Sequence, residues 1–270
     1  MNYHTDEWIM EKVKEHYNEA LQYFPENQIV GIFLQGSQNY GLDTPNSDID
    51  TKLVVLPSLE DIALNKKAVS TTHIRENDEH IDFKDLRLML QTFKKQNLNF
   101  LEILFTKYKI VNPTYEYEWN ILVNNAELIS RYHPLTAVKS MKGIAMEKYH
   151  AMEHRYPSKI EVIDKYGYDP KQLHHLVRVV EWMERYINDE AYIDCLYPKK
   201  ADFIKDLKSN PLNLQDARKM ADNYLQILDK IYANASEKYA NIEPREDVNN
   251  LLETVQYSII KQSIKEELNL

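Results

Sequence analysis

Cysteine and long apolar runs are scarce in this chain of 270 residues. Cys195 is the only cysteine, so neither an intrachain disulfide nor a cluster of thiolate metal ligands can form, and a packing or surface thiol is the simplest interpretation. The sequence contains no long uncharged apolar stretch of the kind that spans a membrane, and its amino terminus lacks a secretory pattern. We therefore expect a cytoplasmic protein without a membrane partner.

Positive charge is also in deficit, because the formal net charge is -9. This balance argues against a broad non-specific nucleic-acid surface, and no extensive duplex DNA surface is expected. The charge is uneven along the chain: residues 131–185 hold ten Lys and Arg against seven Asp and Glu. We therefore expect an anionic substrate to be attracted to the positive charge of that segment.

The first part of the chain has a mixed pattern of helix and strand. An amphipathic helix is predicted from Asp6 to Phe24, and a short one after Ser58. Asp85 is placed to cap a further helix, with another following Asn97. The predicted strands are Ile29–Leu34, Asp50–Leu56, Ala68–Ile74 and His80–Phe83.

After Asn112-Pro113 the pattern is helical throughout. Strand signals cease, and Pro and Asn residues separate the predicted helices, which are Tyr115–Asn125, Pro134–Arg155, Pro170–Asn188, Ala201–Ser209, Asn213–Tyr239 and Arg245–Glu267. We therefore expect an α+β fold: a mixed-sheet domain over residues 1–112 and an all-α domain over residues 113–270.

Two short motifs in the first domain carry chemistry. An apolar strand ends in Gly36-Ser37, and the next strand begins with Asp48-Ile49-Asp50. Side chains alternate along a strand, so Asp48 and Asp50 share one face and together can hold a divalent cation. The alternative is an edge strand with two exposed acids, but aspartate is depleted in strands, so two in alternation need a reason.

Each part of the pattern suits a nucleoside triphosphate. Gly36 lets the backbone approach the phosphates closely, and the Ser37 hydroxyl with nearby amides can hold the β and γ phosphates. The carboxylates would hold Mg²⁺ (or Mn²⁺) ions that bridge the phosphates and the attacking hydroxyl.

The stretch from Gly36 to Asp50 resembles the signature of the DNA polymerase beta nucleotidyltransferase superfamily. It is similar to a bacterial and phage branch of predicted nucleotidyltransferases that includes an RNA-repair-associated type. The similarity continues through Leu86-Arg87, Asn99–Phe105 and Lys171–Arg178, although Asn97-Leu98-Asn99 replaces the Asn-Pro that the family commonly has. This resemblance implies a small nucleotidyltransferase core and transfer of a nucleoside monophosphate from a triphosphate to an acceptor hydroxyl, with pyrophosphate release.

A third carboxylate would complete a site for two ions. Asp82, within a predicted strand, is our choice, as a metal ligand and as acceptor of the nucleophile's proton. Asp85 is the alternative, but it is better explained as a helix cap.

Basic residues of the helical part match the resembling family as well. Lys171, His174 and Arg178 are spaced to share one helix face. They are candidates to contact substrate phosphate, and the alternative is a solvated basic stripe.

The acceptor is not identified by the sequence. An RNA 3′ end, a protein hydroxyl and a small molecule all suit this donor site. Two rival functions remain: a nucleotide-sensing or antitoxin-like module without turnover, and an RNA-binding adaptor that uses the basic middle segment.

Overall fold

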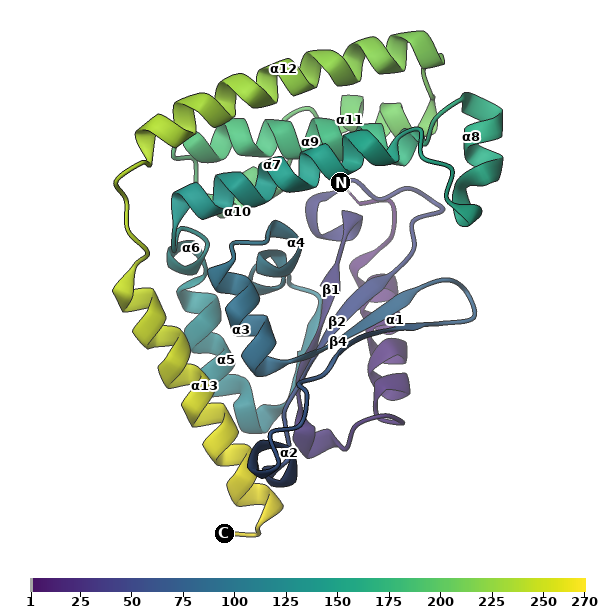
Figure 1. The fold of residues 1–270 in the computed structure, drawn as a ribbon. Coiled ribbons are helices and arrows are strands. Elements are labelled where there is room, and N and C mark those ends of the chain that lie inside the picture. Colours follow the sequence, from purple (N-terminus) through teal and green to yellow (C-terminus); the bar gives the residue numbers. More distant parts are fainter. Residues whose placement is uncertain (1) are drawn as a thin grey trace. The chain divides into compact units, whose positions relative to one another are not determined.

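The computed structural model describes residues 2–270 and divides the chain into two compact units (Figure 1). The first unit comprises the chain up to Tyr132 together with Pro244–Leu270, and the second is His133–Glu243. The predicted α+β class is confirmed. No helix within residues 2–270 is both long and apolar enough to cross a membrane.

The predicted boundary at Asn112-Pro113 differs from the division into units. The reason is a pair of helices from distant parts of the chain, α5 (Glu116–Asn124) and α13 (Glu246–Glu267), which pack on each other within the first unit. α13 also packs on α3 (Leu86–Lys94), as Figure 1 shows. Sequence patterns detect both helices but not their long-range contact.

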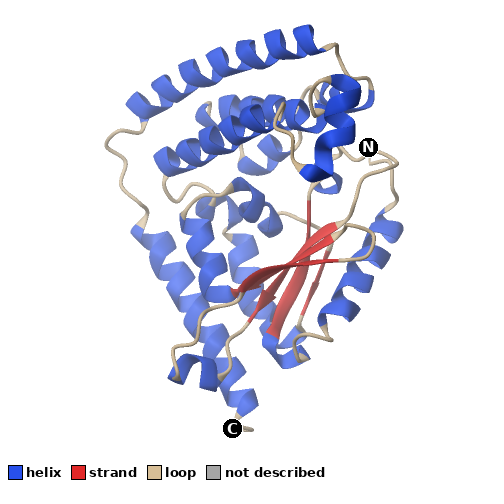
Figure 2. Cartoon of the chain, turned by 45° about the vertical axis from the view of Figure 1, so that its right-hand side comes forward, coloured by secondary structure: helices blue, strands red, loops and turns tan. Residues whose placement is uncertain are grey.

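A mixed five-stranded sheet in the order β3-β4-β2-β1-β5 lies at the centre of the first unit (Figure 2). β1 is antiparallel to β2 and β5, β2 is parallel to β4, and β3 is antiparallel to β4. The first four strands were predicted, whereas β5 is too short for an alternating pattern to reveal it. The strands are β1 (Ile29–Gln35), β2 (Asp50–Val55), β3 (Ser70–Ile74), β4 (His80–Asp85) and β5 (Lys109–Val111).

Helices cover both faces of this sheet. α1 (Asp6–Ala20) lays Ile9 and Val13 on one face, where they join a buried apolar cluster with alternate residues of β1, β2 and β4. On the other face, the ring of Trp119 in α5 stacks on Phe33 of β1 with centroids 4.3 Å apart. The shorter helices of this unit are α2 (Leu59–Ala63), α4 (Leu98–Leu101) and α6 (Ala126–Ile129).

The second unit is entirely helical. α9 is its central element, since α7, α10, α11 and α12 all pack against it. The sequence predicts its four longest helices, whereas α8 and α10 were missed because a helix of one or two turns has little periodicity. The helices are α7 (Pro134–Ala151), α8 (Ile160–Tyr166), α9 (Pro170–Ile187), α10 (Tyr192–Leu196), α11 (Ala201–Ser209) and α12 (Leu214–Lys238).

Gly31 in β1 allows β5 to pair closely. A β-carbon at this position would lie 2.7 Å from the carbonyl oxygen of Ile110 and 3.0 Å from the ring of Phe33. We predict that Gly31→Ala destabilises the protein by about 1–3 kcal/mol, because the strands must separate to relieve the overlap.

The matched control is Gly143→Ala in α7, where the added carbon meets no side chain and no backbone beyond its own helix within 4 Å. It should stabilise its helix by about 0.5–1 kcal/mol. Urea unfolding followed by circular dichroism measures both changes, and equal effects of the two substitutions would contradict the steric explanation.

Candidate functional site

The Gly-Ser turn and the aspartate pair meet at one end of the sheet. Gln35, the last residue of β1, lies opposite Asp50, the first residue of β2. Gly36 follows with φ 101°, a conformation that favours glycine, and a 3₁₀ turn, η2 (Ser37–Tyr40), begins directly after it. The sheet register therefore brings together the two motifs that the sequence predicts to cooperate.

Gln38 connects the turn to the aspartates. Its side-chain amide donates to the carbonyl oxygen of Asp48 over 2.8 Å, and Gln38 itself is 2% exposed. The first amides of a helical turn have no partner within that turn, so the amides of Ser37 and Gln38 offer hydrogen-bond donors beside the carboxylates. The Ser37 hydroxyl makes only a long bond of 3.5 Å to Gln38 Oε1. This arrangement suits a phosphate group.

The surroundings of Asp50 disfavour the ionised form of its carboxylate. Burial, and then the charge of Asp48, raise its pKa above the usual value, while hydrogen bonds from His80 oppose the rise. The backbone amide of His80 donates to Asp50 Oδ1 over 2.9 Å, and His80 Nδ1 lies 3.0 Å from the same oxygen. A divalent cation beside Asp48 and Asp50 would offset the charge that is disfavoured at Asp50.

Asp82 does not join this pair as predicted. In the parallel register of β2 and β4 it lies opposite Lys52, and its Oδ2 is 3.0 Å from the Lys52 ammonium. Its Oδ1 accepts a 2.6 Å hydrogen bond from the hydroxyl of Thr72. Burial would raise the pKa of Asp82, but the charge of Lys52 and these hydrogen bonds outweigh it and lower the pKa.

The three predicted carboxylates therefore do not form one cage. Within residues 2–270, no group of three or more His, Cys, Asp or Glu side chains could hold a metal ion. His80 rather than an acid stands beside Asp50. Asp48 and Asp50 are therefore the carboxylates left for a cation, because both oxygens of Asp82 are engaged by Lys52 and Thr72.

Asp85 is a helix cap, as its position in the sequence predicts. Its side chain caps α3 by accepting the amide of Arg87 over 2.8 Å, and it also binds the Arg87 guanidinium.

A buried network that the sequence did not reveal fixes the backbone of the aspartate motif. Glu79 accepts the amide of Ile49, between the two aspartates, over 3.4 Å. His16 of α1 is fully buried, and its Nε2 donates to Glu79 while its Nδ1 lies 2.9 Å from the hydroxyl of Thr51. The one available signal was a histidine on the apolar face of α1, in register with Val13 and Ala20.

Glu102 holds the Gly-Ser turn from the other side. Its Oε1 accepts the amide of Gly36 over 3.1 Å, and its side chain is buried at 4% exposure. Because this carboxylate takes the Gly36 amide and the Asn39 amide donates to the Gly36 carbonyl, the donors left for a phosphate are the amides of Ser37 and Gln38 and the weakly bonded Ser37 hydroxyl. Glu102 belongs to the Asn99–Phe105 segment that the resemblance singles out, but nothing in its spacing marks this contact.

Lys171, His174 and Arg178 lie in α9 of the second unit, away in sequence from the aspartate motif. His174 is 3% exposed and its Nδ1 donates to the carbonyl of Ile204 over 2.8 Å; burial, partly opposed by this bond, lowers its pKa to about 4. Arg178 is 4% exposed and lies against the ring of Trp182. Two of the three residues are thus buried in the helical unit, and the predicted phosphate contact stays a prediction.

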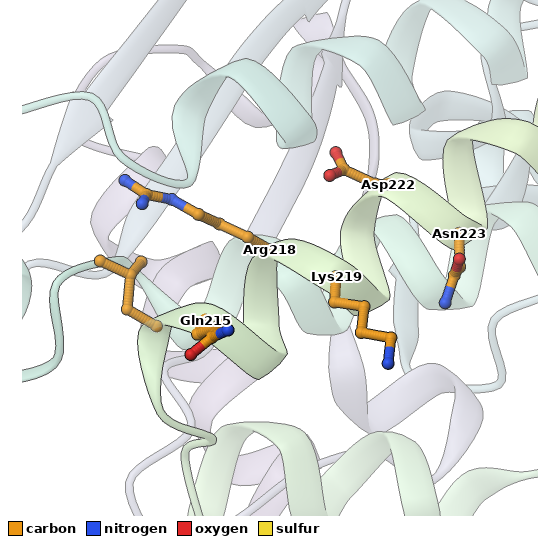
Figure 3. Close-up of a pocket in the computed structure, with 6 residues that line it drawn as sticks. Gln215, Arg218, Lys219, Asp222 and Asn223 are labelled. Carbon is orange, nitrogen blue, oxygen red and sulfur yellow. The ribbon is translucent and has the colours of Figure 1, made fainter.

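Two sizeable cavities are lined by other residues. One, of about 740 Å³, follows a single face of α12, as Figure 3 shows. Its most prominent cation, Arg218, is already paired with Glu153 over 2.7 Å. The other, of about 550 Å³, lies beside the edge strand β3 between Tyr23 and Phe83. Neither includes a residue that the sequence assigns to the site.

A comparison with solved structures finds distant similarity. A nucleotidyltransferase-like protein from Exiguobacterium sibiricum matches 96% of this chain and 92% of its own, with 10% sequence identity and a TM-score of 0.33. No protein-family model and no curated protein matches the sequence.

Glu79 makes the stability of the site depend on pH. Burial would raise its pKa, but hydrogen bonds from His16 and Asn77, the charge of His16 and a bond from Arg75 lower it from 4.5 to about 2. A depressed folded-state pKa gives stability that is present above pH 4.5 and is lost as the pH falls towards about 2.

We therefore predict that the midpoint of thermal unfolding falls steeply between pH 4.5 and about 2, and that Glu79→Gln flattens this part of the profile. Glu7→Gln, on the exposed face of α1, is the control and should leave the profile unchanged. A steep loss that persists in Glu79→Gln would assign the pH dependence to other groups.

Proposed function

We propose that this protein transfers a nucleoside monophosphate from a nucleoside triphosphate to an acceptor hydroxyl. The single observation that carries the proposal is the joining of the Gly36-Ser37 turn to the Asp48–Asp50 pair, through the β1–β2 register and the bond of Gln38 to Asp48. Hydrogen-bond donors for phosphate and paired carboxylates for a cation thus lie side by side.

Each of the two motifs has its own role in the proposed reaction. The Ser37 hydroxyl and the amides of Ser37 and Gln38 hold the outer phosphates, and Gly36 keeps the backbone free of a side chain at that point. Asp48 and Asp50 would hold a divalent cation, Mg²⁺ or Mn²⁺, which would neutralise phosphate charge. The acceptor oxygen forms a bond to the α-phosphorus as the bond to the leaving pyrophosphate breaks, and the hydroxyl proton passes to solvent.

Asp82 has a different role in this proposal from the one its sequence position suggests. It serves as the counter-ion of the buried Lys52, so no second cation and no proton transfer are assigned to it.

RNA 3′ ends, protein hydroxyls and small molecules remain the candidate acceptors.

A second candidate function is a nucleotide-binding module without turnover. The observation that favours it is the absence of a third carboxylate beside Asp50, where His80 stands within the described residues. Metal-dependent pyrophosphate release from any triphosphate would exclude this function. The RNA-binding adaptor has less support, since His174 and Arg178 of its basic segment are buried.

The aspartate pair provides the direct test. We predict that Asp48→Asn together with Asp50→Asn lowers nucleotide transfer by about a thousandfold or more, because neutral amides cannot hold the cation. The fold should be retained or gain stability, since burial and like charge disfavour ionised Asp50. Label transfer from radioactive triphosphates and thermal unfolding measure the two effects.

The matched control replaces Glu7 and Glu11, which are exposed on α1, by Gln. It removes the same formal charge without touching the site, so transfer should be unchanged. Supplying total RNA, lysate protein or the protein alone identifies the acceptor by the fraction that takes label. Undiminished transfer by the double aspartate variant would refute the proposed function.

A further inference from the structure

Two lysines gather around one phenylalanine on the face of the sheet that carries Asp50. The ammonium of Lys52 lies 4.0 Å from the centre of the Phe100 ring, and that of Lys84 lies 4.8 Å from it. Lys52 is two positions after Asp50 in β2, so the two side chains share a face. We call these three residues, Lys52, Lys84 and Phe100, the lysine cluster.

The first lysine of the cluster is fully compensated. Lys52 is only 2% exposed, and a buried ammonium is costly without a partner. Asp82 supplies that partner at 3.0 Å, and Thr72 holds the other carboxylate oxygen. The negative charge of Asp82 therefore compensates the positive charge of Lys52.

The second lysine adds a charge that the fold does not favour. The Lys84 ammonium donates to the Ser70 hydroxyl over a long 3.4 Å. Burial, and then the charge of Lys52, lower its pKa; the charge of Asp82 opposes this in part, and the charge of Lys95 lowers the pKa a little further. Like charges held together at a cost to stability are typical of ligand sites, where the ligand supplies the missing counter-charge.

We propose that Lys84, supported by Lys52 and Phe100, forms an anion subsite that binds a phosphate group of a substrate. Its ammonium and the hydroxyl of Ser70, on the exposed edge strand β3, donate to the phosphate oxygens. The phosphate belongs either to the triphosphate donor or to a phosphate-bearing acceptor. This inference rests on the proposed function only in describing the ligand as its substrate.

The test is Lys84→Met, which keeps an unbranched apolar side chain against Phe100 and removes the charge. Binding of inorganic tripolyphosphate and of a short single-stranded oligonucleotide is measured without divalent cations. We expect at least one of the two affinities to fall about tenfold. The midpoint of thermal unfolding should rise at the same time, because a disfavoured charge has been removed.

Lys109→Met is the matched control. Lys109 lies in β5 at the opposite edge of the sheet, and burial alone lowers its pKa. Its replacement should raise the unfolding midpoint as well, but leave both affinities unchanged. The pair of variants separates the loss of a ligand contact from the relief of burial.

The pattern of affinities identifies the source of the phosphate. If Lys84→Met lowers only the affinity for tripolyphosphate, the subsite binds the donor. If it lowers only the affinity for the oligonucleotide, the subsite binds the acceptor. Affinities unchanged in Lys84→Met, or reduced equally in Lys109→Met, would overturn the proposal. So would a fall in the unfolding midpoint of Lys84→Met.

The same measurements in the background of Asp48→Asn and Asp50→Asn separate this subsite from the proposed function. Lys84-dependent binding of the probe should persist there, because no cation is present in the assay. If wild-type protein transfers no nucleotide but shows this dependence, the proposed function fails and the subsite stands.

Discussion

The register of β2 against its two neighbours is the constraint on which the site depends. Pairing with β1 puts Asp50 opposite Gln35, so the Gly-Ser turn and the carboxylates reach the same end of the sheet. Pairing with β4 then puts Asp82 opposite Lys52. A shift of two residues in this second register would bring Asp82 beside Asp50, and the ion pair between Asp82 and Lys52 favours the register that is observed.

In this part of the sheet, hydrogen bonds fix the backbone of the two motifs, whereas two side-chain charges are held at a cost in free energy. Glu79, Gln38 and Glu102 each bond to a main-chain group of one of the two motifs, which fixes their path. The charges nearby are less well balanced: ionised Asp50 is disfavoured at one position and the ammonium of Lys84 at another. A cation complexed with a phosphate chain carries both of the counter-charges that these groups need.

Local patterns predicted most of the elements, but not the partners of their charged residues. The strands that flank the motifs and the cap at Asp85 follow from alternation and capping chemistry, which act over a few residues. The pairing of Asp82 with Lys52 depends on a sheet register that no spacing rule contains. The spacing of His174 and Arg178 correctly placed them on one helix, but their burial depends on which helices pack against α9.

The return of the chain to the first unit has a consequence for folding. Ser258 of α13 bonds to Glu118 of α5 across 140 positions of sequence, and the whole helical unit lies between them. During synthesis α5 therefore emerges well before the helix that covers it, and its apolar side stays open while the inserted unit is made. Closing so long a loop is slow, and this interval is when the nascent chain most needs protection from aggregation.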